Sequence, residues 1–164
     1  MDIRHAQASD VDAITALEAA CFPPAEAAGR ASFAARVAAF PECFWLGEQD
    51  GRLVSAVNGM ATDEPDLDDA MFADAGLHKP DGAWQMIFGV ATLPAMRRRG
   101  LAASVMRRMI ADSRARGRKG VVLTCKEALV PFYARLGFAD EGLSPSTHGG
   151  AVWHSMRLVF APQA

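Results

Sequence analysis

The stretch from Trp84 to Met109 constrains the fold more than any other part of this chain. Residues 84–92 are almost wholly apolar, which is typical of a strand that is buried on both faces. Gly89 lies inside this strand, where a glycine often marks a bulge or the close approach of another backbone or a ligand. From Leu101 onward, apolar residues recur at helical spacing. The pattern therefore predicts a buried strand, a basic turn and a helix.

The turn between this strand and this helix has the composition of an anion-binding site. The first N–H groups of a helix lack intrahelical partners and carry the positive end of the helix dipole, which favours a phosphate. Gly100 lets a ligand approach the backbone, and Arg97, Arg98 and Arg99 add positive charge. The spacing Arg-x-x-Gly-x-Ala matches neither the Walker loop nor the Rossmann fingerprint. A capped core helix with a solvent-exposed basic end explains these six residues alone, whereas the preceding strand and its glycine favour phosphate binding.

Composition narrows the class of protein. The chain has 164 residues, half of them apolar, and this suits a single domain over 1–164 with a sizeable core. The net charge of -2 gives no basic surplus, so we expect no nucleic-acid partner. No apolar run approaches the roughly 18 residues of a membrane span, and the first residues do not resemble a signal peptide. We therefore expect a cytoplasmic protein without a membrane partner.

The cysteines do not indicate a disulfide framework or a metal site. Cys21, Cys43 and Cys125 are odd in number, and the chain has no Cys-x-x-Cys and no histidines at metal-ligand spacing. We expect three buried thiols and no metal.

The other elements follow from hydrophobic periodicity and turn residues. Ser9 and Asp12 resemble a capping box, and Asp50-Gly51 is typical of a hairpin turn. Residues 62–81 are irregular and acidic, which suits either a solvated loop or a surface that attracts a cationic amine. The elements that we expect are a strand at 3–6, helices at 9–21 and 31–40, strands at 43–48 and 53–60, a short helix near 67–73, a strand at 121–125, a helix at 128–136, and strands at 138–141 and 151–160.

Two motifs resemble a known superfamily. Arg97-x-x-Gly100-x-Ala102 after an apolar strand resembles the acetyl-CoA-binding motif of the GNAT N-acetyltransferases. The string Ala-Leu-Val-Pro-Phe-Tyr-Ala-Arg-Leu-Gly-Phe at 128–138 resembles the serotonin (arylalkylamine) N-acetyltransferase branch, and the likeness covers residues 3–158. The resemblance implies a mixed α/β fold in which a twisted sheet of about seven strands, flanked by about four helices, opens beside the cofactor.

The resemblance also implies roles for particular residues. Tyr133, the only tyrosine, matches the position proposed to protonate the CoA thiolate, and its ordinary pKa near 10 suits that task. Phe88 and Thr124 match positions that line the acceptor. The pantetheine arm is expected on the backbone of Val90, Ala91 and Thr92, and the pyrophosphate on Arg97, Arg98, Arg99, Gly100, Leu101, Ala102 and Ala103.

One departure from the branch affects the expected mechanism. The animal enzymes carry two histidines on the central strand as a proton relay, and the matching positions here are Met86 and Phe88. Three alternatives follow: the base comes from elsewhere in the chain, water carries the proton away without a side-chain base, or the acceptor amine is less basic. His148 is our candidate, ahead of His154, because its glycine-rich loop could fold over the acceptor. Glu18 and Glu26 are weaker candidates.

These expectations lead to one principal hypothesis and one alternative. The principal hypothesis is an acetyl-CoA-dependent N-acetyltransferase that acetylates a primary amine by direct attack in a ternary complex. Cys125 has no histidine close in sequence to activate it as a nucleophile. The alternative is a non-catalytic CoA-binding or sensor module. The presence of Tyr133 argues against this alternative. The acceptor stays open among arylalkylamines, polyamines, amino acids, antibiotics and protein amines, and the chain is expected to be a monomer or homodimer.

Overall fold

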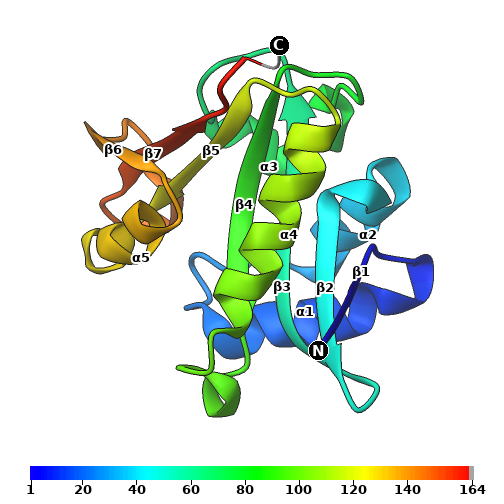
Figure 1. Cartoon of the computed structure of the whole chain (residues 1–164). Helices are drawn as coiled ribbons and strands as arrows, with labels where there is room; N and C mark the ends of the chain where they lie inside the picture. The colour runs from blue at the N-terminus through cyan, green and yellow to red at the C-terminus, as the bar shows by residue number, and fades with distance from the viewer. Residues whose placement is uncertain (163–164) are drawn as a thin grey trace. The chain divides into compact units, whose positions relative to one another are not determined.

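The computed structural model describes residues 1–162, and in them seven strands form one mixed sheet in the order β1-β2-β3-β4-β5-β7-β6 (Figure 1). β4 and β5 pair in parallel, and the pairs β1–β2, β2–β3, β5–β7 and β6–β7 are antiparallel. The strands are β1 (Asp2–Arg4), β2 (Phe44–Gln49), β3 (Arg52–Thr62), β4 (Trp84–Thr92), β5 (Gly120–Cys125), β6 (Ala139–Leu143) and β7 (His154–Val159).

Five α-helices accompany these strands in the same part of the chain. They are α1 (Val11–Cys21), α2 (Arg30–Ala39), α3 (Asp69–Ala73), α4 (Leu101–Ala115) and α5 (Val130–Arg135), and short 3-10 turns precede or follow several of them. The predicted mixed α/β fold, with about seven strands and about four helices, is confirmed.

The chain forms two compact units. The first comprises residues 1–59 and 89–109, and the second comprises residues 60–88 and those from 110 onward. β3, β4 and α4 each contribute residues to both units. The expectation of one domain over 1–164 stays a prediction.

The first unit has its own apolar core. α1 contributes Val11, Ile14 and Leu17 to this core at helical spacing, and Phe33 and Phe44 pack with them. The predicted strand at 3–6 is found at Asp2–Arg4, two residues shorter at its carboxyl end.

The predicted capping box at the start of the first helix was wrong. Ser9 and Asp12 do not form it, because a 3-10 turn, η1 (Ala8–Asp10), precedes α1 and moves the first cap back along the chain. Asp10 instead accepts a hydrogen bond at 2.7 Å from the Gln7 N–H.

The hairpin of the first unit confirms its turn signal. Asp50 and Gly51 have φ values of 52° and 75°, and Gln49 pairs with Arg52 across them. Two successive left-handed residues define the type I′ turn that matches the twist of a hairpin.

The second unit contains the parallel strand pair. Trp84, Gln85 and Met86 pair with Gly120, Val121 and Val122. Gly120 must be a glycine because a Cβ there would lie 2.0 Å from the Leu158 carbonyl oxygen.

Three predicted boundaries in the second unit were wrong. The single helix at 128–136 is a 3-10 turn, η5 (Glu127–Leu129), followed by α5, because Pro131 stands in the first turn of α5 where a new helix begins. The strand at 151–160 starts only at His154, after a 3-10 turn at His148–Gly150. The strand at 138–141 is found at Ala139–Leu143. The short helix near 67–73 is confirmed as α3.

All three cysteines are in the thiol form, outside any disulfide. Cys43 and Cys125 are buried as predicted, but Cys21 is half-buried because it is the last residue of α1. Within residues 1–162, no helix is long and apolar enough to cross a membrane.

Candidate active site

The carboxyl end of β4 is held by side chains of the first unit. The Ser55 hydroxyl donates a hydrogen bond to the Ala91 carbonyl at 3.0 Å and lies 3.0 Å from the Thr92 hydroxyl. The Thr92 carbonyl accepts from the Cys21 thiol at 3.2 Å and from Arg97 Nε at 3.3 Å. These contacts fix the segment that the sequence assigned to the pantetheine arm.

The middle of β4 is more accessible than the residues directly before and after it. Phe88, Gly89 and Val90 are half-buried, whereas Gln85–Ile87 before them and Ala91–Thr92 after them are buried. Side chains and backbone can therefore be reached at the centre of the strand, where Gly89 adds no side chain of its own.

The basic turn after β4 has an unusual backbone. Arg98 has a φ of 64° and Gly100 a φ of 76°. A left-handed conformation costs a residue other than glycine about 1 kcal/mol or more, and such strain collects at functional sites. Alternation of left-handed and other residues turns neighbouring N–H groups toward one side, which creates a concave anion site. Residues 97–100 are exposed, so this surface is open to a ligand.

α4 begins directly after this turn. Its buried face consists of Leu101, Val105, Met106 and Met109, as the periodicity predicted. The Gly100 carbonyl accepts from the Ser104 N–H at 3.1 Å, so the helix starts at Leu101 and its first N–H groups have no intrahelical acceptor. The first turn carries no acidic residue. The seven residues predicted for the pyrophosphate thus lie on the basic turn, 97–100, and at the start of α4, 101–103.

Tyr133 lies on α5 in the second unit and is 5% exposed. Its ring meets Phe132 and Phe138 edge to face, with centroids 5.0 and 6.0 Å away. Burial raises the pKa of the Tyr133 phenol well above its usual value, and the neighbouring Cys125 adds to the effect. The phenol therefore keeps its proton at neutral pH, and the same shift makes it a weaker acid than an ordinary tyrosine.

Cys125 ends β5 in the same unit. Burial, followed by the charge of Asp140, raises the pKa of its thiol to about 11. The thiol is thus protonated at neutral pH, in which state it is a poor nucleophile. Thr124, the predicted acceptor-lining residue, is half-buried beside it and pairs with Ser155 of β7.

Four aromatic side chains of the second unit form a continuous series, which we call the aromatic stack. Phe88 of β4 lies 4.7 Å from Phe72 of α3, and Phe72 lies 4.9 Å from His148 with the rings 14° from parallel. Trp153 completes the series 6.1 Å from His148, and its Nε1–H donates to the His148 carbonyl at 2.9 Å. The stack brings together Phe88 and His148, two predicted site residues, through Phe72, which the sequence analysis did not single out.

The segment that carries His148 is anchored to the start of α3. The Ser146 hydroxyl donates to Asp69 Oδ1 at 2.6 Å, and the Thr147 N–H donates to Asp69 Oδ2 at 3.3 Å. The Ser146 hydroxyl also accepts from the His148 N–H at 3.2 Å. Ser146 and Asp69 are 77 positions apart in the chain, so no local pattern indicates this contact.

The acidic segment borders an open hollow of about 490 Å³ in the second unit. Asp66, which lines it, pairs with Arg157 Nη2 at 2.5 Å, yet the Asp66 side chain is 82% exposed. The Arg157 guanidinium also lies 4.9 Å above the Trp84 ring. The hollow is lined by Glu64, Pro65, Asp66, Leu67, Asp68, Asp69, Met71, Pro145 and Ser146.

Several other aromatic and titratable side chains lie elsewhere. Trp45 is 2% exposed and packs against His5 in the first unit, so it is a core residue. Phe22 packs against the core of that unit. His154 of β7 lies 3.2 Å from the exposed Asp140 carboxylate.

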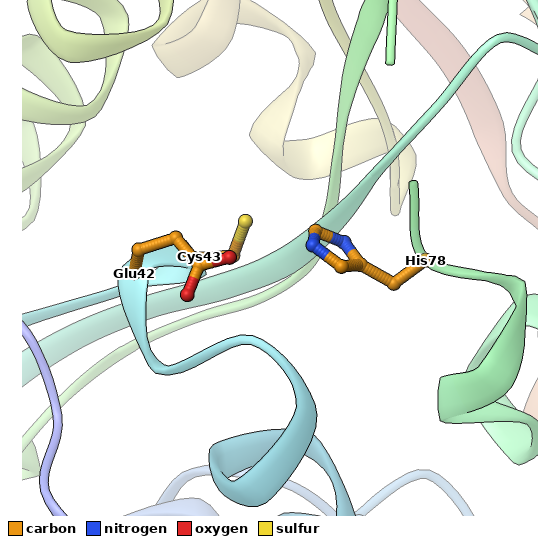
Figure 2. Close-up of side chains that lie close together, drawn as sticks. All are labelled: Glu42, Cys43 and His78. Atoms are coloured by element: carbon orange, nitrogen blue, oxygen red, sulfur yellow. The ribbon is translucent and has the colours of Figure 1, made fainter. Parts of the chain in front are cut away.

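Figure 2 shows Glu42, Cys43 and His78, which are residues of the types that coordinate metals. Glu42 and Cys43 belong to the turn before β2 in the first unit. His78 belongs to the second unit, where its Nδ1 accepts from the Ala61 N–H at 3.1 Å. The expectation that the protein holds no metal stays a prediction.

Comparison with known proteins identifies the family. Residues 11–138 match the model of the acetyltransferase (GNAT) family. The fold is similar to that of GphF, a GNAT-like decarboxylase in complex with isobutyryl-CoA (24% identity, TM-score 0.79, 97% of this chain and 99% of that one).

Two further structures are similar. One is the ribosomal-protein-S18-alanine N-acetyltransferase from Escherichia coli (18% identity, TM-score 0.73, 99% of this chain and 96% of that one). The other is yncA, a putative acetyltransferase from Salmonella typhimurium with its cofactor acetyl-CoA (19% identity, TM-score 0.71, 99% and 95%). At these identities the likeness shows the fold alone, whereas the family model covers most of the chain and includes both the basic turn and Tyr133. The chain therefore belongs to the acetyltransferase (GNAT) family.

Proposed function

We propose that this protein is an acetyl-CoA-dependent N-acetyltransferase that acetylates a small primary amine by direct attack in a ternary complex. The observation that carries the proposal is the basic turn, in which the left-handed Arg98 and Gly100 precede the free amino end of α4. A strained, exposed, positively charged backbone turn suits the pyrophosphate of CoA. Residues 1–164 act as one catalytic domain, as a monomer or a homodimer.

The donor binds through the first unit. Backbone groups of Arg98–Ala103 bind the pyrophosphate, and Arg97, whose Nε donates to the Thr92 carbonyl, adds charge at the end of β4. Val90, Ala91 and Thr92 bind the pantetheine arm. The residues fit such a ligand because the space around a Cβ on Gly100 is empty to 4 Å. Structures of similar fold hold acetyl-CoA or isobutyryl-CoA, which supports an acyl-CoA donor.

Tyr133 supplies the proton for the departing thiolate. Its raised pKa keeps the phenol protonated at every pH at which the protein would work. Burial raises the pKa of the Cys125 thiol to about 11, and a thiol that is protonated at neutral pH supports direct attack over an acyl-enzyme on Cys125. The amine therefore attacks the thioester carbonyl directly.

The aromatic stack supports an acceptor that carries a ring, such as an arylalkylamine. Phe88 and His148 are both half-buried, so each presents part of its ring to a ligand. Thr124 is half-buried as well and offers a hydroxyl. Aromatic rings stack at 4.5–7 Å and gain about 0.5–1.5 kcal/mol per pair beyond burial.

A thiol-release assay with acetyl-CoA and a panel of amines, led by phenethylamine and tryptamine, tests the proposal. We expect turnover with the arylalkylamines and, in parallel, a higher melting temperature with acetyl-CoA alone. Stabilisation by acetyl-CoA without turnover on any amine would favour a non-catalytic CoA-binding module. If acetyl-CoA did not stabilise the protein and no amine gave turnover, the proposal would be overturned.

The chemical route is tested separately. After mixing with acetyl-CoA without an acceptor, intact-mass spectrometry should show unmodified protein. An added acetyl group on Cys125 would replace direct attack by an acyl-enzyme route.

A further inference from the structure

A buried carboxylate lies beside β4 in the first unit. Glu18, on α1, is 9% exposed. Its Oε2 accepts a hydrogen bond from the Ala28 N–H at 3.0 Å. Its Oε1 lies 3.5 Å from the position that a Cβ on Gly89 would occupy. The carboxylate is therefore held in one orientation and points one oxygen toward the centre of the strand.

Gly89 places no side chain between this oxygen and the strand backbone. A side chain at this position would stand between the carboxylate and the strand backbone, and its Cβ would also lie 3.4 Å from Asn58 Nδ2. Gly89 and its neighbour Val90 are half-buried. Because a strand rises about 3.3 Å per residue, the Glu18 oxygen lies within about 7 Å of the backbone of Val90, the first residue proposed to bind the pantetheine arm.

Arg36 keeps a positive charge near Glu18. The Arg36 side chain is 4% exposed, and its Nη1 donates to Asn58 Oδ1 at 3.2 Å. Burial lowers the pKa of Arg36 to about 10, and the charge of Glu18 opposes this shift. Burying two opposite charges near each other adds little net stability, because desolvation offsets most of their attraction. Stability alone therefore explains poorly why Glu18 and Arg36 are both buried here.

We propose that Glu18 is the group that receives a proton from the ammonium of the acceptor. This assignment rests on the proposed acetyl transfer and names the base that the absence of histidines at Met86 and Phe88 leaves open. His148 then contacts the acceptor ring through the aromatic stack, rather than removing the proton.

The proton inventory balances. An ammonium proton moves to the Glu18 carboxylate and from there to water. The neutral nitrogen forms the C–N bond as the C–S bond breaks, and the nitrogen loses a second proton to water. Tyr133 gives a proton to the thiolate and recovers one from water. The sum is one amide, one thiol and one released proton.

The test compares Glu18→Gln with wild type on two acceptors of nearly equal shape. Phenethylamine is mostly an ammonium at pH 7.5, whereas O-benzylhydroxylamine replaces one methylene by oxygen and is neutral. Glutamine keeps an oxygen for the Ala28 N–H but cannot take a proton. We expect kcat/KM to fall about 10²-fold with phenethylamine and less than about 5-fold with O-benzylhydroxylamine.

Two controls separate this role from a structural one. Glu127→Gln makes the same chemical change at an exposed position and should leave both rates within about 2-fold of wild type. The melting-temperature rise with acetyl-CoA should be the same in Glu18→Gln and wild type.

Each contrary result has its own meaning. Equal losses on both acceptors, or an unchanged rate with phenethylamine, would overturn the role of Glu18 while leaving acetyl transfer intact. Absence of turnover by the wild-type protein would overturn the proposed function itself.

Discussion

The basic turn and the aromatic stack are built in opposite ways. The basic turn and the start of α4 are consecutive in the chain, Arg97–Ala103, and offer mainly backbone N–H groups. The stack consists of side chains from β4, α3 and the segment before β7. Recognition by backbone therefore leaves a short local motif in a sequence, whereas recognition by side chains is spread over segments that only the fold brings together.

The two regions also differ in what a single substitution can change. A backbone turn depends on conformation and charge, so one residue of the wrong charge affects every N–H group around it. A stack of side chains loses one contact at a time. We therefore expect larger effects in the turn than in the stack, and the following predictions test this order.

The largest effect is expected for Gly100→Asp. Asp tolerates the left-handed conformation better than most residues, so the principal change is a negative charge placed against a pyrophosphate. The Michaelis constant for acetyl-CoA should rise about 10²-fold or more, equivalent to about 2.7 kcal/mol. Steady-state kinetics with varied acetyl-CoA measures it.

Two matched variants interpret that result. Gly100→Asn has the same shape without the charge and should raise the Michaelis constant much less. Gly117→Asp places the same residue at an exposed position with a similar φ of 77°, and it should leave the Michaelis constant for acetyl-CoA unchanged. Equal Michaelis constants for acetyl-CoA in Gly100→Asp and wild type would mean that the turn does not bind the donor.

The next effect is expected for Tyr133→Phe. The ring keeps its packing against Phe132 and Phe138, and only the proton donor is lost. Turnover should fall about 10²-fold, with little change in the melting temperature.

The pH dependence gives a second reading of Tyr133. Because burial raises its pKa, the phenol stays protonated as the pH rises through its ordinary value of about 10. Loss of the Tyr133 proton should therefore not lower the wild-type rate below about pH 10. Any fall of the rate in that range should also be present in Tyr133→Phe. A variant with near-wild-type turnover would exclude Tyr133 as the acid.

The contrast between backbone and side chains also explains how much of the fold could be predicted. β4 was predicted to the residue because a long apolar run bounded by proline and glycine has no competing interpretation. The edge strand β6 was displaced because its burial pattern is almost wholly exposed and carries no alternation to read. The false capping box arose because the sequence does not distinguish a 3-10 turn at residues 8–10 from the first turn of α1.

The candidate site was predictable to a similar extent. The basic turn and Tyr133 stand in local motifs, and their positions on a turn and a helix follow from neighbouring residues. Phe72, Asp69 and Ser146 could not be singled out, because their contacts join segments that are far apart in the chain. Glu18 looks like any polar helix residue until Gly89 is found beside it.

A moderate effect is expected for His148→Ala in the aromatic stack. The variant removes the ring that lies 4.9 Å from Phe72. The Michaelis constant for phenethylamine should rise about 5- to 10-fold, since one aromatic contact contributes about 0.5–1.5 kcal/mol. The constant for an aliphatic amine such as hexylamine should change less. A fall of turnover alone, with unchanged Michaelis constants, would instead assign proton removal to His148.

The smallest effect is expected for Ser146→Ala, which tests whether the stack needs its anchor. The serine hydroxyl joins the Asp69 carboxylate to the His148 N–H, so its loss removes two hydrogen bonds and leaves the Thr147 N–H as the remaining donor to Asp69. Each bond contributes about 0.5–1.5 kcal/mol in a protein, and less where water replaces it at an exposed site. The Michaelis constant for phenethylamine should therefore rise about 2- to 3-fold while the constant for acetyl-CoA stays fixed, and amide exchange at residues 146–150 should become faster. If the acetyl-CoA constant rises as much as the amine constant, the two regions are coupled, and the separation drawn between backbone and side-chain recognition fails.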